Sequence, residues 1–114
     1  MAIEHLVLIE QNDGVTEAQA QEVMDGIAAL KDQVPGILDV KIGNNFSDRA
    51  PHISHAAVVT LADKDALAAY GPHPAHQELL KILMPMAKNI TIADIEVQAG
   101  ERTVHPLKFG VFDH

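Results

Sequence analysis

Histidine is the residue type in this chain that most directly suggests chemistry. The 114 residues include seven histidines, no cysteine, no tryptophan and a single tyrosine, Tyr70. An imidazole with an ordinary pKa of about 6.5 takes up and returns a proton near neutral pH. A phenol with a pKa of about 10 can hold a developing oxyanion by donating a hydrogen bond. Together the two groups could carry out acid/base chemistry on a carbonyl compound.

Hydrophobic periodicity places three of the histidines on apolar faces. His5 and His55 each alternate with aliphatic residues in a predicted strand, and His76 lies on the aliphatic stripe of a predicted helix. An imidazole without a partner in an apolar layer costs free energy, so such rings are usually hydrogen-bonded. We expect these three imidazoles to converge with Tyr70 in a polar pocket between the helices and the sheet.

Two simpler interpretations compete with a catalytic one. A histidine on an apolar face is often a hydrogen-bonded core residue and nothing more. His73 and His76 are spaced like a pair of metal ligands, but no Asp or Glu lies on the same stripe, and Pro74 places His73 at the helix cap. We therefore expect neither a metal site nor a cofactor. Surface positions are expected for His52, His105 and His114.

The elements that position these residues follow from periodicity and from helix-capping and helix-breaking residues. Strands are predicted at 3–9, 37–42, 55–61 and 89–97. A long helix begins at Thr16, with Gln19 completing a capping box, and ends at Pro35. A short helix runs from Asp63 to Tyr70, and another starts at Pro74 and is bent or stopped by Pro85.

The order of these elements is strand, helix, strand, strand, helix, strand. This βαββαβ order is that of a ferredoxin-like α+β sandwich, in which an antiparallel sheet carries both helices on one face. The first strand is apolar on both faces, so we expect the uncovered face to dimerise. We expect residues 1–99 to form one domain. The apolar tail 100–114 is expected to pack on the sheet or on the partner subunit, and its deletion to weaken dimerisation.

Composition and charge exclude several classes of partner. Sixteen acidic residues against eight Lys and Arg give a net charge of -8, which repels phosphate backbones, so we expect no nucleic acid partner. The N-terminus has no basic region, and its first apolar stretch is too short for a signal peptide or a membrane span. The lack of cysteine is compatible with a reducing compartment. We expect a cytoplasmic protein with no membrane association.

Four segments in their order resemble a known family. They are Ile3-Glu-His-Leu-Val-Leu, Pro35-Gly-Ile-Leu, the strand that begins at His55, and Tyr70-Gly-Pro-His-Pro-Ala-His76. Across residues 3–97 the chain resembles the stress-responsive dimeric A/B barrel proteins. The resemblance implies a ferredoxin-like protomer whose sheet packs face to face with that of a second copy to form a dimeric α/β barrel.

The resemblance also implies roles for individual residues. Most members of the family have no established activity, but a plant polyketide cyclase in it uses a histidine and a tyrosine for an aldol-type ring closure. Carried over to this chain, His76 and Tyr70 would be the catalytic pair. The resemblance also places His5 and His55 in the lining of the pocket. Apart from the resemblance, we expect Val7 and His73 to contact the substrate as well.

These observations lead to two hypotheses. The first is a homodimer that binds a small carbonyl compound and catalyses cofactor-free cyclisation, isomerisation or lyase chemistry, with His76 as general base and acid and Tyr70 as oxyanion or enol stabiliser. The alternative is a non-catalytic, stress-related ligand-binding or structural dimer in which the same residues form an inert hydrogen-bond network. A solvent-connected cavity in which the Tyr70 hydroxyl and a ring nitrogen of His76 face a common point favours the first. A His76 ring capped by a backbone carbonyl in a dry core would rule out the first and favour the second.

Overall fold

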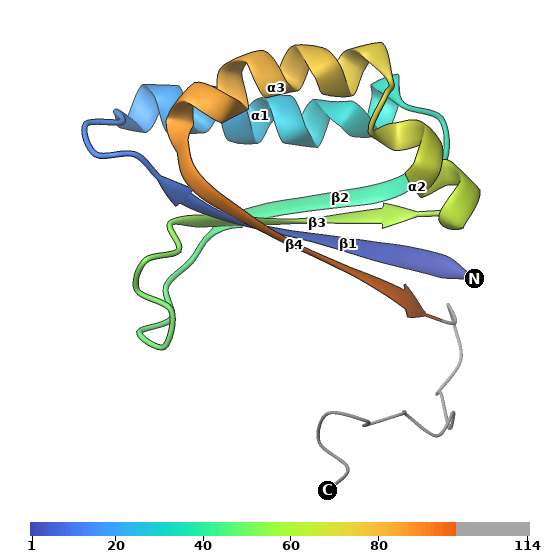
Figure 1. The fold of residues 1–114 in the computed structure, drawn as a ribbon, viewed down its shortest axis with the longest axis horizontal. Helices are drawn as coiled ribbons and strands as arrows, with labels where there is room; N and C mark the ends of the chain where they lie inside the picture. Colours follow the sequence, from blue (N-terminus) through green and yellow to red (C-terminus); the bar gives the residue numbers. More distant parts are fainter. Residues whose placement is uncertain (98–114) are drawn as a thin grey trace, which may run out of the picture.

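The structure is a computed structural model that describes residues 1–97. Its elements confirm the predicted ferredoxin-like order, with three helices and four strands (Figure 1). Strand β4 begins directly after α3, two residues earlier than the sequence predicts. The elements are β1 (Ala2–Gln11), α1 (Glu17–Gln33), β2 (Ile37–Asn44), β3 (His55–Leu61), α2 (Lys64–Tyr70), α3 (Pro74–Met86) and β4 (Ala87–Val97).

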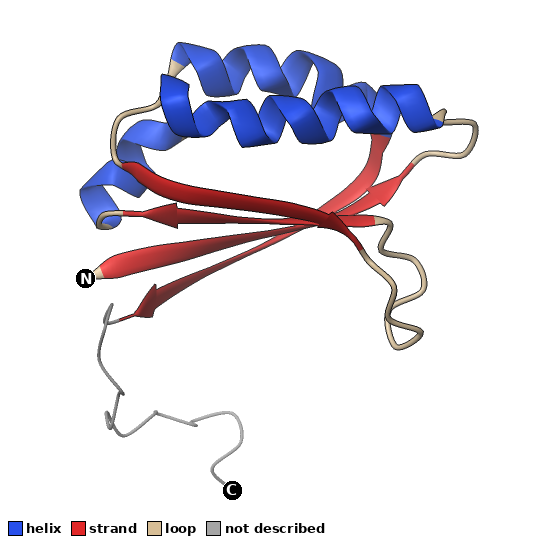
Figure 2. Cartoon of the chain, turned by 180° about the vertical axis from the view of Figure 1, so that it is seen from behind, coloured by secondary structure: helices blue, strands red, loops and turns tan. Residues whose placement is uncertain are grey.

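The four strands form one antiparallel sheet in the order β2-β3-β1-β4. Helices α1 and α3 lie side by side across one face of this sheet, and α2 lies at the end of β3 (Figures 1 and 2). The core fills the space between the two layers. One stripe of α1 supplies much of it, namely Ala20, Val23, Met24, Ile27 and Leu30.

Local capping fixes where each helix begins. Thr16 forms the predicted capping box, because its hydroxyl accepts from the Gln19 amide at 3.1 Å and the Gln19 side chain accepts from the Thr16 amide at 2.9 Å. The Asp63 carboxylate caps α2 by accepting from the Ala66 amide at 2.8 Å. Helix α3 ends one residue after Pro85, as expected for a proline that stops a helix.

Within residues 1–97, no helix covers the second face of the sheet. Alternation along β1 points His5, Val7 and Ile9 into the core and the intervening residues to this open face. Leu8 and Ile95 are 38% and 47% exposed there. The register places the other apolar residues of the face beside them, namely Leu6, Ala56, Val58 and Ala93.

Two other expectations concern the tail and membrane association. The predicted packing of the tail 100–114 lies outside the described residues. Within residues 1–97, no helix is both long enough and apolar enough to cross a membrane.

Candidate functional site

Three of the four predicted rings meet beneath the helices. The centroids of the His5 and Tyr70 rings lie 5.4 Å apart in an edge-on arrangement, and those of Tyr70 and His76 lie 4.5 Å apart. His5 comes from the middle of β1, Tyr70 is the last residue of α2, and His76 lies in the first turn of α3. The rings of three separate elements thus form one cluster.

The turn between α2 and α3 sets the positions of Tyr70 and His76. The His73 amide donates to the Tyr70 carbonyl at 3.2 Å, which closes the turn. Nδ1 of the His73 ring then accepts from the Ala75 amide at 3.0 Å and caps α3, with Pro74 in the first helical position. His73 therefore acts as a cap, as its position before Pro74 predicts.

The His76 ring is held in one tautomer by the same turn. Its Nδ1 lies 3.0 Å from the carbonyl oxygen of Gly71. Because a carbonyl oxygen can only accept, Nδ1 carries the proton, and in the neutral ring Nε2 has the free lone pair. The turn thus leaves His76 with a nitrogen that can act as a base.

A pocket of about 330 Å³ lies against the three rings. Its volume falls within the range of small-molecule sites. Most of its wall is aliphatic and comes from both layers, and Val7 contributes to it as predicted. No Lys or Arg side chain lines it within residues 1–97. The other lining residues are Ile27, Leu67, Gly71, Leu79, Leu80, Leu83, Ile90 and Ile92.

Asp94 joins the cluster through His5, a contact that the sequence analysis missed. Its Oδ1 lies 2.5 Å from Nδ1 of His5, because the register pairs Asp94 directly opposite His5 across β1 and β4. The side chain of His5 is 11% exposed and that of Asp94 is 40% exposed. Alternation of Asp94 with Ile90 and Ile92 could have placed this carboxylate on the core-facing side of β4.

Burial favours the neutral forms of both Tyr70 and His76. Loss of solvent raises the pKa of the Tyr70 phenol to about 12, so the hydroxyl keeps its proton at neutral pH. Loss of solvent also lowers the pKa of His76 below 6.5; the Gly71 hydrogen bond opposes this and the nearby His5 adds to it. At pH 7 the pair therefore consists of a hydrogen-bond donor and a neutral base.

Three polar atoms of the cluster are available to a ligand. Within residues 1–97 no hydrogen bond is formed by the Tyr70 hydroxyl, by Nε2 of His76 or by Nε2 of His5. These atoms can offer one hydroxyl proton and two ring nitrogens to a molecule with a polar end. The aliphatic wall would receive an apolar body.

His55 does not join this cluster, so the predicted convergence of three imidazoles is wrong. It pairs with Ile9 in the sheet, whereas His5 pairs with Val59. The two histidines are thus four residues apart along the strands, about 13 Å at about 3.3 Å per residue. Alternation correctly assigns both rings to the helix-covered face, but it does not fix their positions along that face. Nor does His73 line the pocket.

Metal-binding residues do not gather in the part of the chain that the structure describes. Across residues 1–97, no three side chains among His, Asp and Glu come together as a metal site would require. The cluster instead pairs one carboxylate with one imidazole and places a phenol and a second imidazole beside them.

Comparison with known proteins places the chain among its relatives. Olivetolic acid cyclase from Cannabis sativa is 30% identical over 78 residues, which are 67% of this chain and 77% of that protein. An uncharacterized protein from Streptomyces coelicolor is 34% identical over 96 residues, covering 82% of this chain and 98% of its own.

A solved structure and a family model extend the comparison. A dimeric ferredoxin-like protein of unknown function from Thermobifida fusca superimposes with a TM-score of 0.75 at 28% identity, covering 85% of this chain and 92% of that one. The sequence model of the Stress responsive A/B Barrel Domain matches residues 3–97. The chain therefore belongs to the stress-responsive A/B barrel domain family.

Proposed function

We propose that this protein is a homodimer that binds a small carbonyl compound in the pocket beside Tyr70 and catalyses cofactor-free acid/base chemistry on it. The reaction would be of the cyclase, isomerase or lyase type. The observation that carries the proposal is the pairing of a protonated phenol with a neutral imidazole, both with free polar atoms, at the wall of an otherwise aliphatic pocket. The similarity to olivetolic acid cyclase supports it.

The proposed step divides the work between Tyr70 and His76. The Tyr70 hydroxyl donates a hydrogen bond to the substrate's carbonyl oxygen, and Nε2 of His76 takes a proton from the adjacent carbon. The electron pair of the broken C–H bond forms the C=C bond of an enolate, whose charge rests on the oxygen that Tyr70 holds. The imidazolium of His76 then returns its proton to carbon or to a leaving atom.

His5 and Asp94 position the substrate in this proposal. The hydrogen bond from Nδ1 of His5 to the Asp94 carboxylate fixes the ring, and directs Nε2 of His5 away from the carboxylate. Val7, on the same face of β1, supplies apolar wall beside it. His55 and His73 lie outside the pocket and receive no role in the reaction.

The open face of the sheet supports the homodimer. Its apolar residues would be covered if two sheets packed face to face, as in a dimeric α/β barrel. The Thermobifida fusca protein, which is 28% identical, is described as dimeric. We propose that Leu8 and Val58 lie at the centre of this interface. A location in the cytoplasm stays a prediction from the sequence.

A non-catalytic ligand-binding dimer is the second candidate. The hydrogen bonds from His76 to Gly71 and from His5 to Asp94 favour it, because they hold both rings at the pocket wall whether or not a proton is transferred. Both candidates require a ligand in the Tyr70 pocket. They differ in whether the bound compound exchanges a proton with the protein.

Binding is tested first with acetophenone, a compact ketone without charge. We expect saturable changes in the NMR signals of amides around the pocket, and weaker binding of ethylbenzene, which lacks the carbonyl oxygen. Tyr70→Phe should weaken acetophenone binding about three- to tenfold, the value of one hydrogen bond. His52→Gln, in an exposed loop, is the matched control and should leave binding unchanged. Equal affinity for the two compounds, or shifts centred elsewhere, would count against the proposal.

A further inference from the structure

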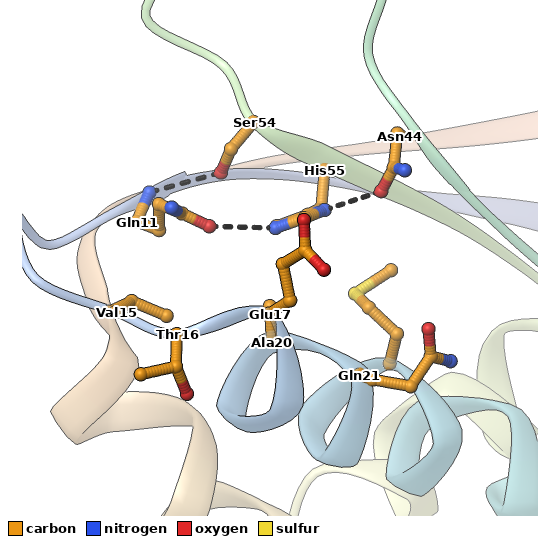
Figure 3. A pocket seen from close by; sticks show the side chains of 10 residues that line it. Gln11, Val15, Thr16, Glu17, Ala20, Gln21, Asn44, Ser54 and His55 are labelled. Carbon is orange, nitrogen blue, oxygen red and sulfur yellow. Dashed lines mark hydrogen bonds between the residues drawn. The ribbon is translucent and has the colours of Figure 1, made fainter.

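A second cavity, of about 490 Å³, lies at the other end of the space between the layers (Figure 3). The first turns of α1 form one side of it, and the ends of β1 and β2 and the start of β3 form the other. It is distinct from the Tyr70 pocket and shares no lining residue with it. The lining residues are Gln11, Val15, Thr16, Glu17, Ala20, Gln21, Met24, Asn44, Ser54 and His55.

His55 is held between two amide side chains at the wall of this cavity. Its Nε2 lies 2.9 Å from Oε1 of Gln11, and its Nδ1 lies 2.9 Å from Oδ1 of Asn44 (Figure 3). A neutral imidazole has only one N–H group, so it can donate to only one of the two oxygens. Burial lowers the pKa of His55 below 6.5, which favours the neutral ring at pH 7.

With a neutral ring, one of the two side-chain amides must therefore be rotated so that its NH₂ group, not its oxygen, faces His55. The side chain of Gln11 or Asn44 then donates its N–H to the unprotonated ring nitrogen. Its oxygen takes the place of the amide nitrogen, on the side away from His55. Because Gln11 and Asn44 both line the cavity, the rotation leaves one amide oxygen of its wall without the contact to His55 and able to accept a hydrogen bond from a ligand.

Two further acceptors face the same space from α1. The Glu17 side chain extends from the first turn of the helix toward the strands (Figure 3). The Gln21 amide donates an Nε2–H group to Asp25 at 2.8 Å, and within residues 1–97 its oxygen forms no hydrogen bond, so it can accept one. No Lys or Arg side chain lines the cavity within residues 1–97. Its polar part thus favours a ligand that is positively charged and rich in donors.

The remaining wall is apolar. Val15, Ala20 and Met24 line the cavity next to these polar groups. We propose that the cavity binds a short protonated alkylamine, with its ammonium group on Glu17 and the freed amide oxygen and its alkyl chain against these three residues. An ammonium group has three N–H donors and no acceptor, which matches this set of acceptors.

Binding at this site is coupled to the protonation of His55. The protonated ring donates to both amide oxygens and adds a positive charge, so it withdraws an acceptor from the amine and repels it. Glu17 is the other titratable side chain among the ten lining residues. By linkage, the bound amine must lower the pKa of His55.

The test follows the His55 ring protons by NMR in the full chain during titration with n-butylammonium chloride. We expect a saturable shift at pH 7.5, and a lower pKa of His55 when the amine is bound. Binding should weaken roughly tenfold in Glu17→Gln, which loses a charge-assisted hydrogen bond. Glu22→Gln removes the same charge from another exposed position of the same helix, one that does not line this cavity, and should bind as the unmodified protein does.

Binding of neutral n-butanol shows whether the cavity recognises the ammonium group or only the alkyl chain. We expect butanol to bind at least tenfold more weakly than the amine, as loss of a charge-assisted contact implies. The proposal is overturned if butanol binds equally well, if Glu17→Gln binds normally, or if the His55 pKa does not move. Circular dichroism of both variants checks that their helices remain formed. Acetophenone binding at the Tyr70 pocket is an independent measurement.

Discussion

Burial raises the pKa of Tyr70 and lowers that of His76, and both shifts favour the neutral side chain. A buried phenol resists losing its proton, and a buried imidazole resists gaining one, because each would become charged. The neutral forms of both are the ones that hydrogen-bond donation and proton abstraction require. The local environment of the pocket thus prepares both residues for acid/base chemistry near pH 7.

The shifted pKa of His76 predicts a dependence of stability on pH. Its folded-state pKa lies below 6.5, so the unfolded chain binds the proton more tightly, and protonation favours unfolding. Stability should therefore fall as the pH drops through 6.5, and this loss should end below the folded-state pKa. Urea unfolding at pH 7.5 and pH 5 should show a smaller loss in His76→Gln. His52→Gln should behave like the unmodified protein; an unchanged loss in His76→Gln would contradict the burial of this ring.

At the scale of elements, the sequence predicts the faces of strands better than positions along them. Alternation placed both His5 and His55 on the helix-covered side, which is correct. Their separation along the sheet depends on strand register, which is set by pairing between distant segments. The contact of Asp94 with His5 was missed for the same reason, because it requires the register of β1 against β4.

Capping residues were more informative, because their contacts are local. The start of α1 depends on Thr16 and Gln19, and that of α3 on His73 and Pro74. Each of these pairs lies within a few residues along the chain, so the sequence alone shows it. The His76 contact with Gly71 spans five residues, but the positions of the two flanking helices determine it. The sequence therefore predicted that His76 faces inward without predicting its tautomer.

Gly36 lies between α1 and β2 and packs against α2, the helix that carries Tyr70. It follows α1 with a φ of +90°, and a Cβ there would lie 2.7 Å from the Cβ of Ala66 on α2. Gly36→Ala should lower the free energy of unfolding by about 2–4 kcal/mol, from left-handed strain and overpacking together. Gly14→Ala, with a φ of +85° and open space, carries the strain alone and should cost about 1–2 kcal/mol. Equal losses in denaturant unfolding would show that Gly36 does not support α2.

At the scale of the whole molecule, residues 1–97 form two layers, and the helix layer covers only one face of the sheet. The open face has an apolar centre, although the chain carries a net charge of -8. That charge opposes association of two copies at long range, so a stable dimer requires close apolar contact to offset it. Two sheets packed face to face would supply such contact.

The dimer is tested by placing a charge on the open face. Leu8→Glu should convert the protein to a monomer in sedimentation velocity, because it would bury an unpaired carboxylate in the interface. Met84→Glu introduces the same charge on α3, where Met84 is 58% exposed, and should sediment as the unmodified protein does. Dimers of Leu8→Glu at micromolar concentration would place the interface elsewhere. A monomeric unmodified protein would refute the homodimer itself.

Proton transfer by His76 and Tyr70 is the central claim, and exchange of substrate protons in D₂O measures it directly. The protein is incubated with acetophenone, and deuterium incorporation at its methyl carbon is followed by NMR at pH 7.5. We predict exchange above the buffer rate, reduced about 100-fold or more in His76→Ala, reduced to a lesser degree in Tyr70→Phe, and unchanged in His52→Gln. Exchange at the buffer rate while acetophenone binds, or exchange that survives His76→Ala, would contradict the catalytic role and leave a ligand-binding protein.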